Sequence, residues 1–492
     1  MKQIIGIVFL LFPTISSIAQ PESEPGQLRY QTEMFASAAS GTYTPFWLVS
    51  NRYGMAPLSA GNGYLSTGMM YERSWGKGFR WDAGIDLAVA APRYRNVFVR
   101  QLYAELGYRS FLFTVGSKEQ ANSLWDKNLS SGDMVLSANA RPIPEAKISM
   151  PSYAFVPGTG EWLAVKGDFG VGRSFDSRYL ASFANGKQVY IEHVLWHHKA
   201  IFFRMEAPDN RFPVSLELGV QHGVQWGGVS TNPSLGKQPQ STVDFLRIVA
   251  GMSGGSNASE SDQINVLGNQ YGSYDIRLTY KREGWALRAY HQRYFEDKSG
   301  TIFGNGKDGL WGVQLDLAGV PWLQKMLVEC IDTRNQTGPF HFIAFDHDKY
   351  PGVGGGADNY YNNGEYTTGL SYFNRSIGTP LLPSPEYNTD GSIGFKNNRV
   401  YAWHFGLSGQ FSPRITYRVL FSTMDSWGTP YRPFPDNKRG TSGLLEMSYR
   451  PVRLPGWIFT GSIASDTGTF TGKSLGFALC VSKRGILPTR PK

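Results

Sequence analysis

Alternation of apolar and polar residues is the feature that most constrains how this chain can fold. Across residues 79–89 the odd positions read Phe, Trp, Ala, Ile, Leu and Val, whereas the even positions read Arg, Asp, Gly, Asp and Ala. Residues 214–226 repeat the pattern, and it recurs along almost the whole chain with aromatic residues near the ends of the runs. A period of two places one set of side chains on each face of a β-strand. Strands with one apolar face, one polar face and aromatic ends are typical of a transmembrane β-barrel in an outer membrane.

The first residues of the chain predict export from the cytoplasm. They combine a basic residue, Lys2, with an apolar stretch from Ile4 to Phe12 and a small-x-small cleavage motif at residues 17–19. This is the pattern of a secretory signal peptide, which is too short to serve as a membrane anchor. We therefore divide the chain into a signal peptide, residues 1–19, and one outer-membrane β-barrel, residues 20–492.

Composition favours one large barrel over two or three soluble domains. No run of about 18 apolar residues follows the signal peptide, so no transmembrane helix is expected. The hydrophobic fraction of 41% fits a barrel with a polar lumen, because only alternate strand residues meet lipid. Aromatic residues, at 14%, supply interfacial girdles, and the 57 glycines supply turns and bends. The two cysteines, Cys330 and Cys480, do not make a disulfide framework, and Cys480 is expected on the lumen face of its strand.

The formal net charge of +9 is spread along the chain rather than clustered. A dispersed excess of this kind does not indicate nucleic-acid binding. It suits an acidic partner, such as the phosphates of lipid A or an anionic polysaccharide. Ordinary surface charge explains it equally well, and the sequence leaves both interpretations open.

The alternation predicts eighteen strands. If the first strand runs outward, the connections after even-numbered strands are periplasmic, and all but one of them are short, as periplasmic turns should be. The opposite connections are mostly long, as extracellular loops should be, with a short turn at residues 197–199 as the exception. The expected strands are 28–36, 63–74, 79–90, 97–108, 111–117, 162–172, 188–196, 200–207, 214–226, 272–282, 285–295, 310–318, 325–333, 400–411, 414–423, 442–450, 457–465 and 473–482.

The long outer loops are expected to plug the lumen in part. Residues 129–153, which are bounded by prolines and carry few charges, are predicted to enter the lumen as a constriction, where irregular backbone is tolerated. A further strand-like segment, 366–373, breaks the in–out parity and is placed inside an outer loop. The expected outer loops are 37–62, 118–161, 227–271, 296–309, 334–399 and 424–441.

Motifs for metal or catalytic chemistry are weak. His193, His197 and His198 fall in a segment that reads as strand and turn, so a helical metal-ligand spacing has no meaning there. The glycine-rich run 352–358 lacks the lysine and the strand-to-helix context of a phosphate loop, and residues 346–348 show only the start of a calcium-loop spacing. No feature selects a catalytic serine. We expect no enzymatic activity, no metal and no cofactor.

The outer loops are rich in aromatic, amide and basic residues. Sugar rings stack on aromatic side chains, while Asn, Asp and Arg bind hydroxyl and carboxylate groups, so this composition suits glycan recognition. The same residues also suit packing of the loops inside the mouth, and composition does not decide between the two roles. The candidate glycan-binding residues are Trp125, Arg141, Tyr360, Tyr361, Arg375, Trp427, Tyr431 and Arg432.

Four segments of the chain resemble the Wzi-like capsule assembly family of outer-membrane proteins. They are TPFWLVSNRYG (44–54), QLYAELGYRSFLFTVGSKE (101–119), LSSGDMVLSANARPIPE (129–145) and VPGTGEWLAVKGDFGVGR (156–173). The resemblance implies a monomeric outer-membrane barrel of about this strand count that acts as a surface lectin, without catalysis or cofactor. It also implies a periplasmic helical cap, for which residues 173–187 are the best candidate in this sequence.

The leading hypothesis is therefore a barrel that attaches or assembles capsular polysaccharide by non-covalent binding through loops 118–161, 334–399 and 424–441. Its expected partners are capsular or another surface polysaccharide, outer-membrane lipid and lipopolysaccharide, and the barrel assembly machinery during biogenesis. The alternatives are a porin-like or exporter channel, an outer-membrane enzyme that acts on lipids, and a secreted soluble β protein. Lumen charges such as Arg80 and Asp82 permit a channel, but the long loops argue against a wide pore.

Overall fold

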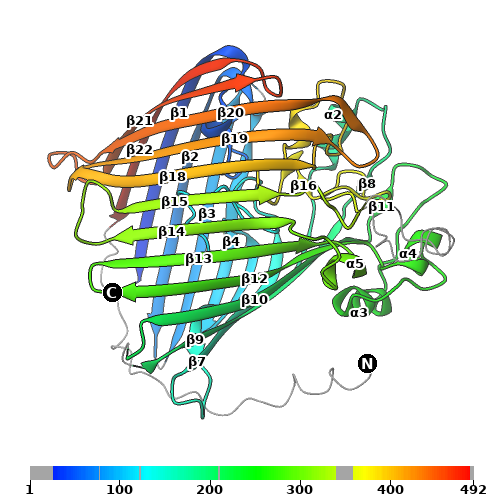
Figure 1. Ribbon diagram of the computed structural model, residues 1–492, viewed down its shortest axis with the longest axis horizontal. Helices are drawn as coiled ribbons and strands as arrows, with labels where there is room; N and C mark the ends of the chain where they lie inside the picture. Colours follow the sequence, from blue (N-terminus) through cyan, green and yellow to red (C-terminus); the bar gives the residue numbers. More distant parts are fainter. Residues whose placement is uncertain are drawn as a thin grey trace.

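The chain folds into a closed, eighteen-stranded antiparallel β-barrel, as the alternation predicts (Figure 1). The computed structural model describes residues 26–76, 78–92, 94–120, 124–208, 211–338 and 358–487. The predicted signal peptide, residues 346–348 and most of the run 352–358 lie outside these residues. No helix within the described ranges is long and apolar enough to cross a membrane.

Each strand pairs with its sequence neighbours in the barrel, and the first strand pairs with the last, so no edge is left open. Closure satisfies every backbone hydrogen bond of the wall, which hydrocarbon demands. The barrel strands are β1 (Gln27–Tyr43), β2 (Ser59–Trp75), β3 (Phe79–Ala91), β4 (Tyr94–Tyr108), β5 (Phe111–Ser117), β6 (Glu145–Phe155), β7 (Leu163–Arg173), β9 (Leu195–Glu206), β10 (Val214–Trp226), β12 (Asn269–Arg282), β13 (Trp285–Phe295), β14 (Gly309–Leu317), β15 (Lys325–Asp332), β18 (Val400–Ser412), β19 (Ile415–Gly428), β20 (Pro433–Tyr449), β21 (Trp457–Gly468) and β22 (Ser474–Leu487).

The two faces of each strand differ as the sequence pattern requires. On β10, Leu218 and Val220 are exposed on the outer face, whereas Glu217 and Gln221 are buried in the lumen. Aromatic side chains form a girdle at the end of the barrel where the connections are short, for example the stacked rings of Trp75 and Phe79. The outer face is therefore the lipid face, and we call the two ends of the barrel the turn end and the loop end.

Two strand predictions were wrong. One strand was predicted in excess and one was missed, so the total of eighteen is unchanged. Residues 197–199 do not form a turn, since β9 runs through them without interruption. The predicted strand 188–196 contributes a two-residue strand, β8 (Ile191–Glu192), and the first two residues of β9. Residues 145–155 form β6 rather than part of a loop. Its pattern is hidden by Pro151, which lies where the β6–β7 register is interrupted between Met150 and Ala154, the kind of position at which a sheet tolerates proline.

Because the prediction missed β6, it also placed the connection between β7 and β9 at the wrong end of the barrel. Residues 174–194 lie at the loop end, so the segment 173–187 is not a periplasmic helical cap. It forms α2 (Ser177–Ala184), which packs against the long loop through rings such as Tyr179 on Phe373. Three outer loops are much shorter than predicted, because 37–62 reduces to 44–58, 118–161 to 118–144 and 424–441 to the turn 429–432.

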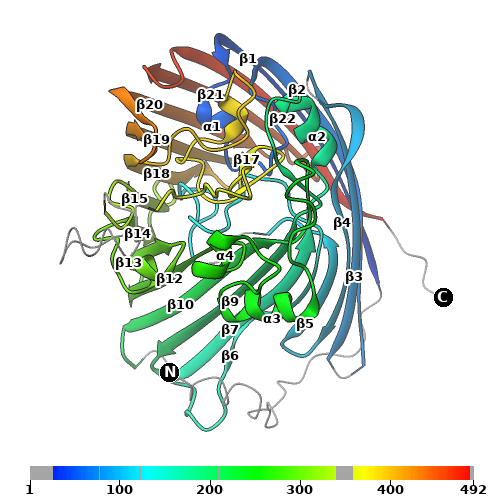
Figure 2. The same cartoon turned by 90° about the vertical axis from the view of Figure 1, so that its right-hand side faces the viewer.

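Loop segments fold back into the barrel and close its loop end (Figure 2). They bring α1 (Phe46–Val49), the 3-10 turn η2 (Pro385–Tyr387) and a small ribbon of β16 (Ser371–Tyr372) with β17 (Arg375–Ser376). The ribbon confirms that 366–373 belongs to a loop. We call the inward-folded segments 44–58, 124–144 and 358–399 the plug. Other loop elements are β11 (Val229–Ser230), α3 (Thr242–Ala250), α4 (Glu260–Ile264) and α5 (Lys298–Thr301).

Both cysteines are free thiols on different faces of the wall. Cys480 alternates with the exposed Leu479 and so faces the lumen, as predicted, whereas Cys330 alternates with the buried Glu329 and faces outward. No disulfide joins them, and the fold rests on closure and packing.

Val328 tests the orientation of the wall, because it lies midway along β15 between the outward-facing Val313 and Phe405. We expect Val328→Arg to destabilise the barrel by about 2–4 kcal/mol, the cost of a cation on the lipid face near the midplane. Val328→Ile keeps the surface apolar and should stay near the wild-type value. Urea unfolding in lipid vesicles measures both variants, and equal stability of the arginine variant and wild type would contradict the assigned lipid face.

Candidate functional site

A carboxylate of the barrel wall holds the first part of the plug. Glu329 lies on the lumen face of β15 and is fully buried. Its carboxylate accepts hydrogen bonds from the Ser130 hydroxyl at 2.7 Å, from the Ser131 amide at 2.7 Å and from the Ser131 hydroxyl at 2.6 Å. The hydroxyl of Tyr290, on the wall strand β13, donates a further bond of 2.5 Å. Hydrogen bonds to a charged acceptor are among the stronger ones, so this contact fixes residues 130–131 inside the lumen.

Neighbouring contacts extend the same anchor along the plug. Asp133 accepts from Trp125 Nε1 at 2.9 Å, from Gln221 of the wall at 2.9 Å, and from the backbone amide of Val135 at 2.6 Å. The imidazole of His404, on β18, contacts the carbonyl of Leu129 at 2.7 Å. The constriction predicted for 129–153 is therefore confirmed for its first half, whereas its second half is strand β6.

The long loop 358–399 packs on top of this segment. The Tyr361 hydroxyl donates to the Met134 carbonyl at 2.5 Å and accepts from the Thr379 amide at 3.2 Å. Arg375 forms a buried ion pair with Glu386 and donates to the Ala56 carbonyl at 2.8 Å. The three plug segments thus bind one another as well as the wall, and they form one core.

Five of the eight candidate glycan-binding residues belong to this core. Tyr360 and Tyr361 are fully buried, with their rings edge-on to Tyr294 of β13. The Arg141 guanidinium lies 3.9 Å from the centre of the Phe98 ring and 4.6 Å from that of Phe373. Trp125 and Arg375 are buried in the contacts described above. In this conformation a polymer in solution does not reach these five side chains, and their aromatic and cationic character serves packing.

The other three candidates lie at the rim of the mouth. Trp427 is near the end of β19, on the side of the wall that faces away from the lumen, and Tyr431 and Arg432 lie in the exposed turn after it. The Arg334 guanidinium stands 5.5 Å from the Trp427 ring and 4.5 Å from the Tyr401 ring. We call these five residues, Arg334, Tyr401, Trp427, Tyr431 and Arg432, the rim surface.

No sequence pattern marks Tyr401 as a surface candidate, because it falls inside an expected strand. Its position becomes apparent only from the pairing of β15 with β18 and of β18 with β19, which brings 332–334, 401 and 427 together on the outer side of the mouth. Further basic residues lie beside the rim surface, including Lys438 over the Phe434 ring and Arg439 paired with Asp425.

The three histidines do not form one cluster. His197 faces outward and packs against the rings of Phe169 and Phe245. His198 faces the lumen and pairs with Glu145 at 2.6 Å and Asp168 at 2.8 Å. Within the described part of the chain, no group of three His, Cys, Asp or Glu side chains is arranged to hold a metal ion.

Two Gly-x-Ser-x-Gly runs occur, at residues 251–255 and 472–476. Ser474 begins β22, and its hydroxyl donates to the Tyr43 carbonyl at 2.7 Å, while Ser253 lies in the connection between α3 and α4. Neither serine stands on a strand-to-helix turn, the geometry that exposes a nucleophile in hydrolases.

A half-buried carboxyl group, Glu296, and a buried one, Asp358, stand where the loop 296–308 meets the plug. Burial raises the pKa of Glu296 to about 8, although the Tyr361 amide and the Tyr294 hydroxyl both donate hydrogen bonds to it. Burial raises the pKa of Asp358 to about 9, and the nearby carboxylates of Asp297 and Glu296 add to this shift. The folded plug therefore favours the neutral forms of both groups.

Replacing the anchoring carboxylate should loosen the plug. In Glu329→Gln the plug keeps its shape but loses the charged acceptor, and we expect local destabilisation of about 2–3 kcal/mol. Limited proteolysis should cut residues 124–144 faster, and single barrels in planar bilayers should show conductance steps that wild type lacks. Glu105→Gln is the matched control, because this buried carboxylate of β4 accepts from Thr114 of β5 and pairs with Lys118 just beyond it, with no plug backbone among these partners. Unchanged proteolysis and conductance in Glu329→Gln would contradict the anchor.

Plug order should depend on pH through Glu296 and Asp358. Because their folded-state pKa values lie above the ordinary values of 4.5 and 3.8, stability favoured by the neutral forms is full below about pH 4 and is lost as pH rises toward 8 to 9. Hydrogen–deuterium exchange of residues 358–382, corrected for intrinsic rates, should accelerate across that range. The double variant Glu296→Gln/Asp358→Asn should flatten the dependence, and an unchanged pH profile in that variant would refute this assignment.

Comparison with known structures shows the same architecture. Wzi of Escherichia coli, described as an outer-membrane protein involved in group 1 capsule assembly and a carbohydrate-binding β-barrel, superposes with a TM-score of 0.54 at 14% identity, covering 92% of this chain and 83% of that one. OccK5 of Pseudomonas aeruginosa has a TM-score of 0.48 at 10% identity, covering 94% and 98%, and OprD of the same organism has 0.46 at 10%, covering 94% and 96%. Among curated protein sequences, none matches the chain.

The family model described as capsule assembly protein Wzi matches residues 89–381, which is more than half of the chain. The matched region runs from the end of β3 to the ribbon of the plug, so it contains Glu329 and the segment that this carboxylate anchors. The eighteen-stranded outer-membrane barrel therefore belongs to the Wzi capsule assembly family.

Proposed function

We propose that this barrel binds capsular polysaccharide at the cell surface and retains it there without covalent chemistry. The observation that supports this most directly is the closed mouth. The plug is packed against the lumen wall through buried hydrogen bonds, so the loop end offers a surface for binding rather than a passage. Membership of the Wzi capsule assembly family supports the same substrate class.

The rim surface has the chemistry that a polymer of sugars requires. Trp427, Tyr401 and Tyr431 offer aromatic rings on which sugar C–H groups stack, and Arg432 offers donors to hydroxyl and carboxylate oxygens. Arg334 pairs with Asp332 at 2.6 Å and holds the Tyr401 and Trp427 rings in place. Each contact is weak, but a polymer repeats its unit and can engage many barrels at once. Retention then follows from multivalency rather than from one tight site.

The basic residues near the rim favour an anionic polymer. Lys438 and Arg439 lie on the strand that follows the turn 429–432, and Arg439 is largely exposed. Opposite charges raise the rate of encounter and weaken as salt is added. The net charge of +9 agrees with this preference.

The remaining expectations become part of the same proposal. Residues 1–19 would direct export and be removed, and the barrel assembly machinery would insert the chain, which we propose acts as a monomer. We propose that no chemical step is catalysed. A porin-like channel is the less favoured alternative, because the plug crosses the lumen at the height of Glu329 and Gln292, each of which binds plug backbone.

The rim surface gives the proposal a direct test. We expect Trp427→Ala/Tyr431→Ala to weaken binding of the purified barrel to immobilised capsular polysaccharide by about tenfold, since each ring contributes about 0.5–1 kcal/mol. Phe175→Ala removes an exposed ring elsewhere at the loop end and should bind as wild type does. Heat-modifiable migration on gels verifies folding. If the folded double variant binds with unchanged affinity, glycan recognition by the rim surface is wrong.

A further inference from the structure

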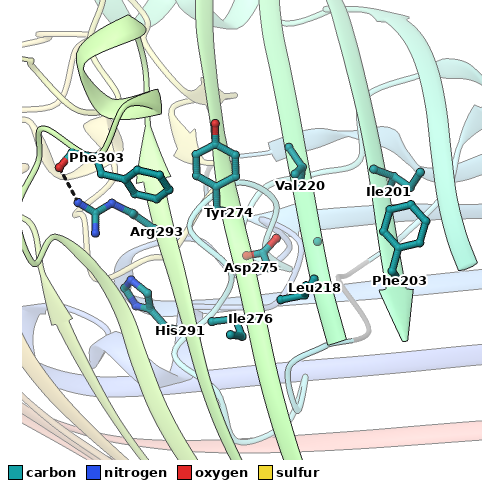
Figure 3. A pocket seen from close by; sticks show the side chains of 11 residues that line it. Ile201, Phe203, Leu218, Val220, Tyr274, Asp275, Ile276, His291, Arg293 and Phe303 are labelled. Carbon is teal, nitrogen blue, oxygen red and sulfur yellow. Dashed lines mark hydrogen bonds between the residues drawn. The ribbon is translucent and has the colours of Figure 1, made fainter. Parts of the chain in front are cut away.

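A groove on the outer face of the barrel is not used by the plug or the rim surface. It has a volume of about 400 Å³ and crosses β9, β10, β12 and β13 (Figure 3). Register places its outward-facing side chains in two rows. The row nearer the loop end is Ile201, Val220, Tyr274 and Arg293, and the row below it is Phe203, Leu218, Ile276 and His291.

The loop 296–308 bends over one side of the groove. The Phe303 ring lies 5.5 Å from the ring of Tyr274, and the Tyr274 hydroxyl contacts the Thr301 carbonyl at 3.4 Å. Arg293 holds the loop in this position, because its guanidinium donates to the Phe303 carbonyl and to Asn305 Oδ1, both at 3.0 Å. One side of the groove thus has an aromatic rim with a cation beside it.

Helix α3 forms a ledge above the other side. Phe245 packs against Phe169, His197 and Trp226, all of which face away from the lumen. The next outward-facing residue below His197 on β9 is Lys199, whose ammonium group donates to the Val249 carbonyl near the C-terminal end of α3. The helix therefore lies on the outer surface of the wall, and a second cation stands between it and the groove.

The opposite side of α3 is also apolar. Val243 is 57% exposed and Leu246 is 62% exposed, and Ala250 continues the stripe at helical spacing. A helix that is apolar on both sides, with one side packed on a barrel wall, is suited to an apolar environment on the other. On the far side of the groove the Phe303 ring, which is 59% exposed, also suits an apolar environment.

The height of the groove matches the outer membrane–water interface. Trp285, in the girdle at the turn end, and Arg293 are eight residues apart on β13. At about 3.3 Å per residue and a tilt of about 40°, the two lie about 20 Å apart along the barrel axis, close to the height of a lipid belt of about 25 Å. The aliphatic rows then face acyl chains, while Arg293 and Lys199 reach the level of the head groups.

We propose that this groove binds lipopolysaccharide, the phosphorylated glycolipid of the outer leaflet. An acyl chain lies along Ile201, Leu218, Val220 and Ile276, and phosphate groups meet Arg293 and Lys199 at the two sides. Cations on both flanks favour an anionic head group over a zwitterionic one. The site is separate from the rim surface, so it does not depend on the proposed binding of polysaccharide.

Native mass spectrometry of the purified, delipidated barrel tests the site. Lipopolysaccharide is added at a fixed molar ratio, and phosphatidylglycerol and phosphatidylethanolamine are added in parallel samples. Arg293→Gln removes the charge, and Val220→Trp fills the groove with a side chain that the lipid face tolerates. Arg178→Gln and Val313→Trp are the matched controls, since Arg178 is exposed on α2 at the loop end and Val313 lies on the lipid face of β14 outside the groove.

We expect either groove variant to lower the bound fraction of lipopolysaccharide by about tenfold, the effect of losing one charged hydrogen bond or the acyl contact, while both controls bind as wild type does. If Val220→Trp does not fold, Arg293→Gln still decides the result. Equal binding by groove variants and controls would overturn the proposal, as would an equal loss of phosphatidylethanolamine binding, because the groove would then be a general lipid contact.

Discussion

The absence of water in the hydrocarbon layer is the constraint from which the rest of this structure follows. Every backbone amide and carbonyl that crosses the layer needs a partner in the protein, and closure of β1 on β22 supplies the last row of them. Closure fixes which residues face lipid and which face the lumen, because alternation leaves no choice of face. The apolar wall and the polar lumen are two results of one hydrogen-bond pattern.

The polar lumen is what makes an ordered plug feasible. Plug segments have irregular backbone, and their amide groups need acceptors that an apolar core would not provide. Glu329 and Gln292 offer acceptors from two strands, and the His404 imidazole of a third strand donates to the Leu129 carbonyl of the plug. Asp133 within the plug accepts from Gln221 of a fourth strand. A lumen that could have held a water-filled channel instead binds a protein core, and the surface left for function is at the rim and on the outer wall.

The sequence predicts the barrel well because alternation is a direct record of the two faces. The strand prediction fails where the alternation of apolar and polar residues is interrupted. Pro151 hides β6, and the polar run at 197–199 imitates a turn in the middle of β9, although His197 is outward-facing and covered by Phe245. Phe245 belongs to α3, which is distant in sequence from β9, so no local pattern predicts its contact with His197.

The candidate site was harder to predict, because recognition of sugars and packing of loops use the same residue types. Tyr361 and Trp427 are alike in composition and loop context, but one donates its hydroxyl to Met134 inside the plug and the other lies under Arg334 at the rim. Only the three-dimensional arrangement distinguishes them. Tyr401 shows the converse case, since strand pairing places a residue from an expected strand in the rim surface.

Retention of polysaccharide by the cell is the central claim, and a strain that lacks this protein tests it most directly. Surface polysaccharide is quantified on washed cells and in the medium, with the parent strain and a complemented strain beside it. We predict that cell-bound polymer falls and free polymer rises while the total stays constant. No change in either pool, or a fall in total polymer without release, would contradict a role in retention.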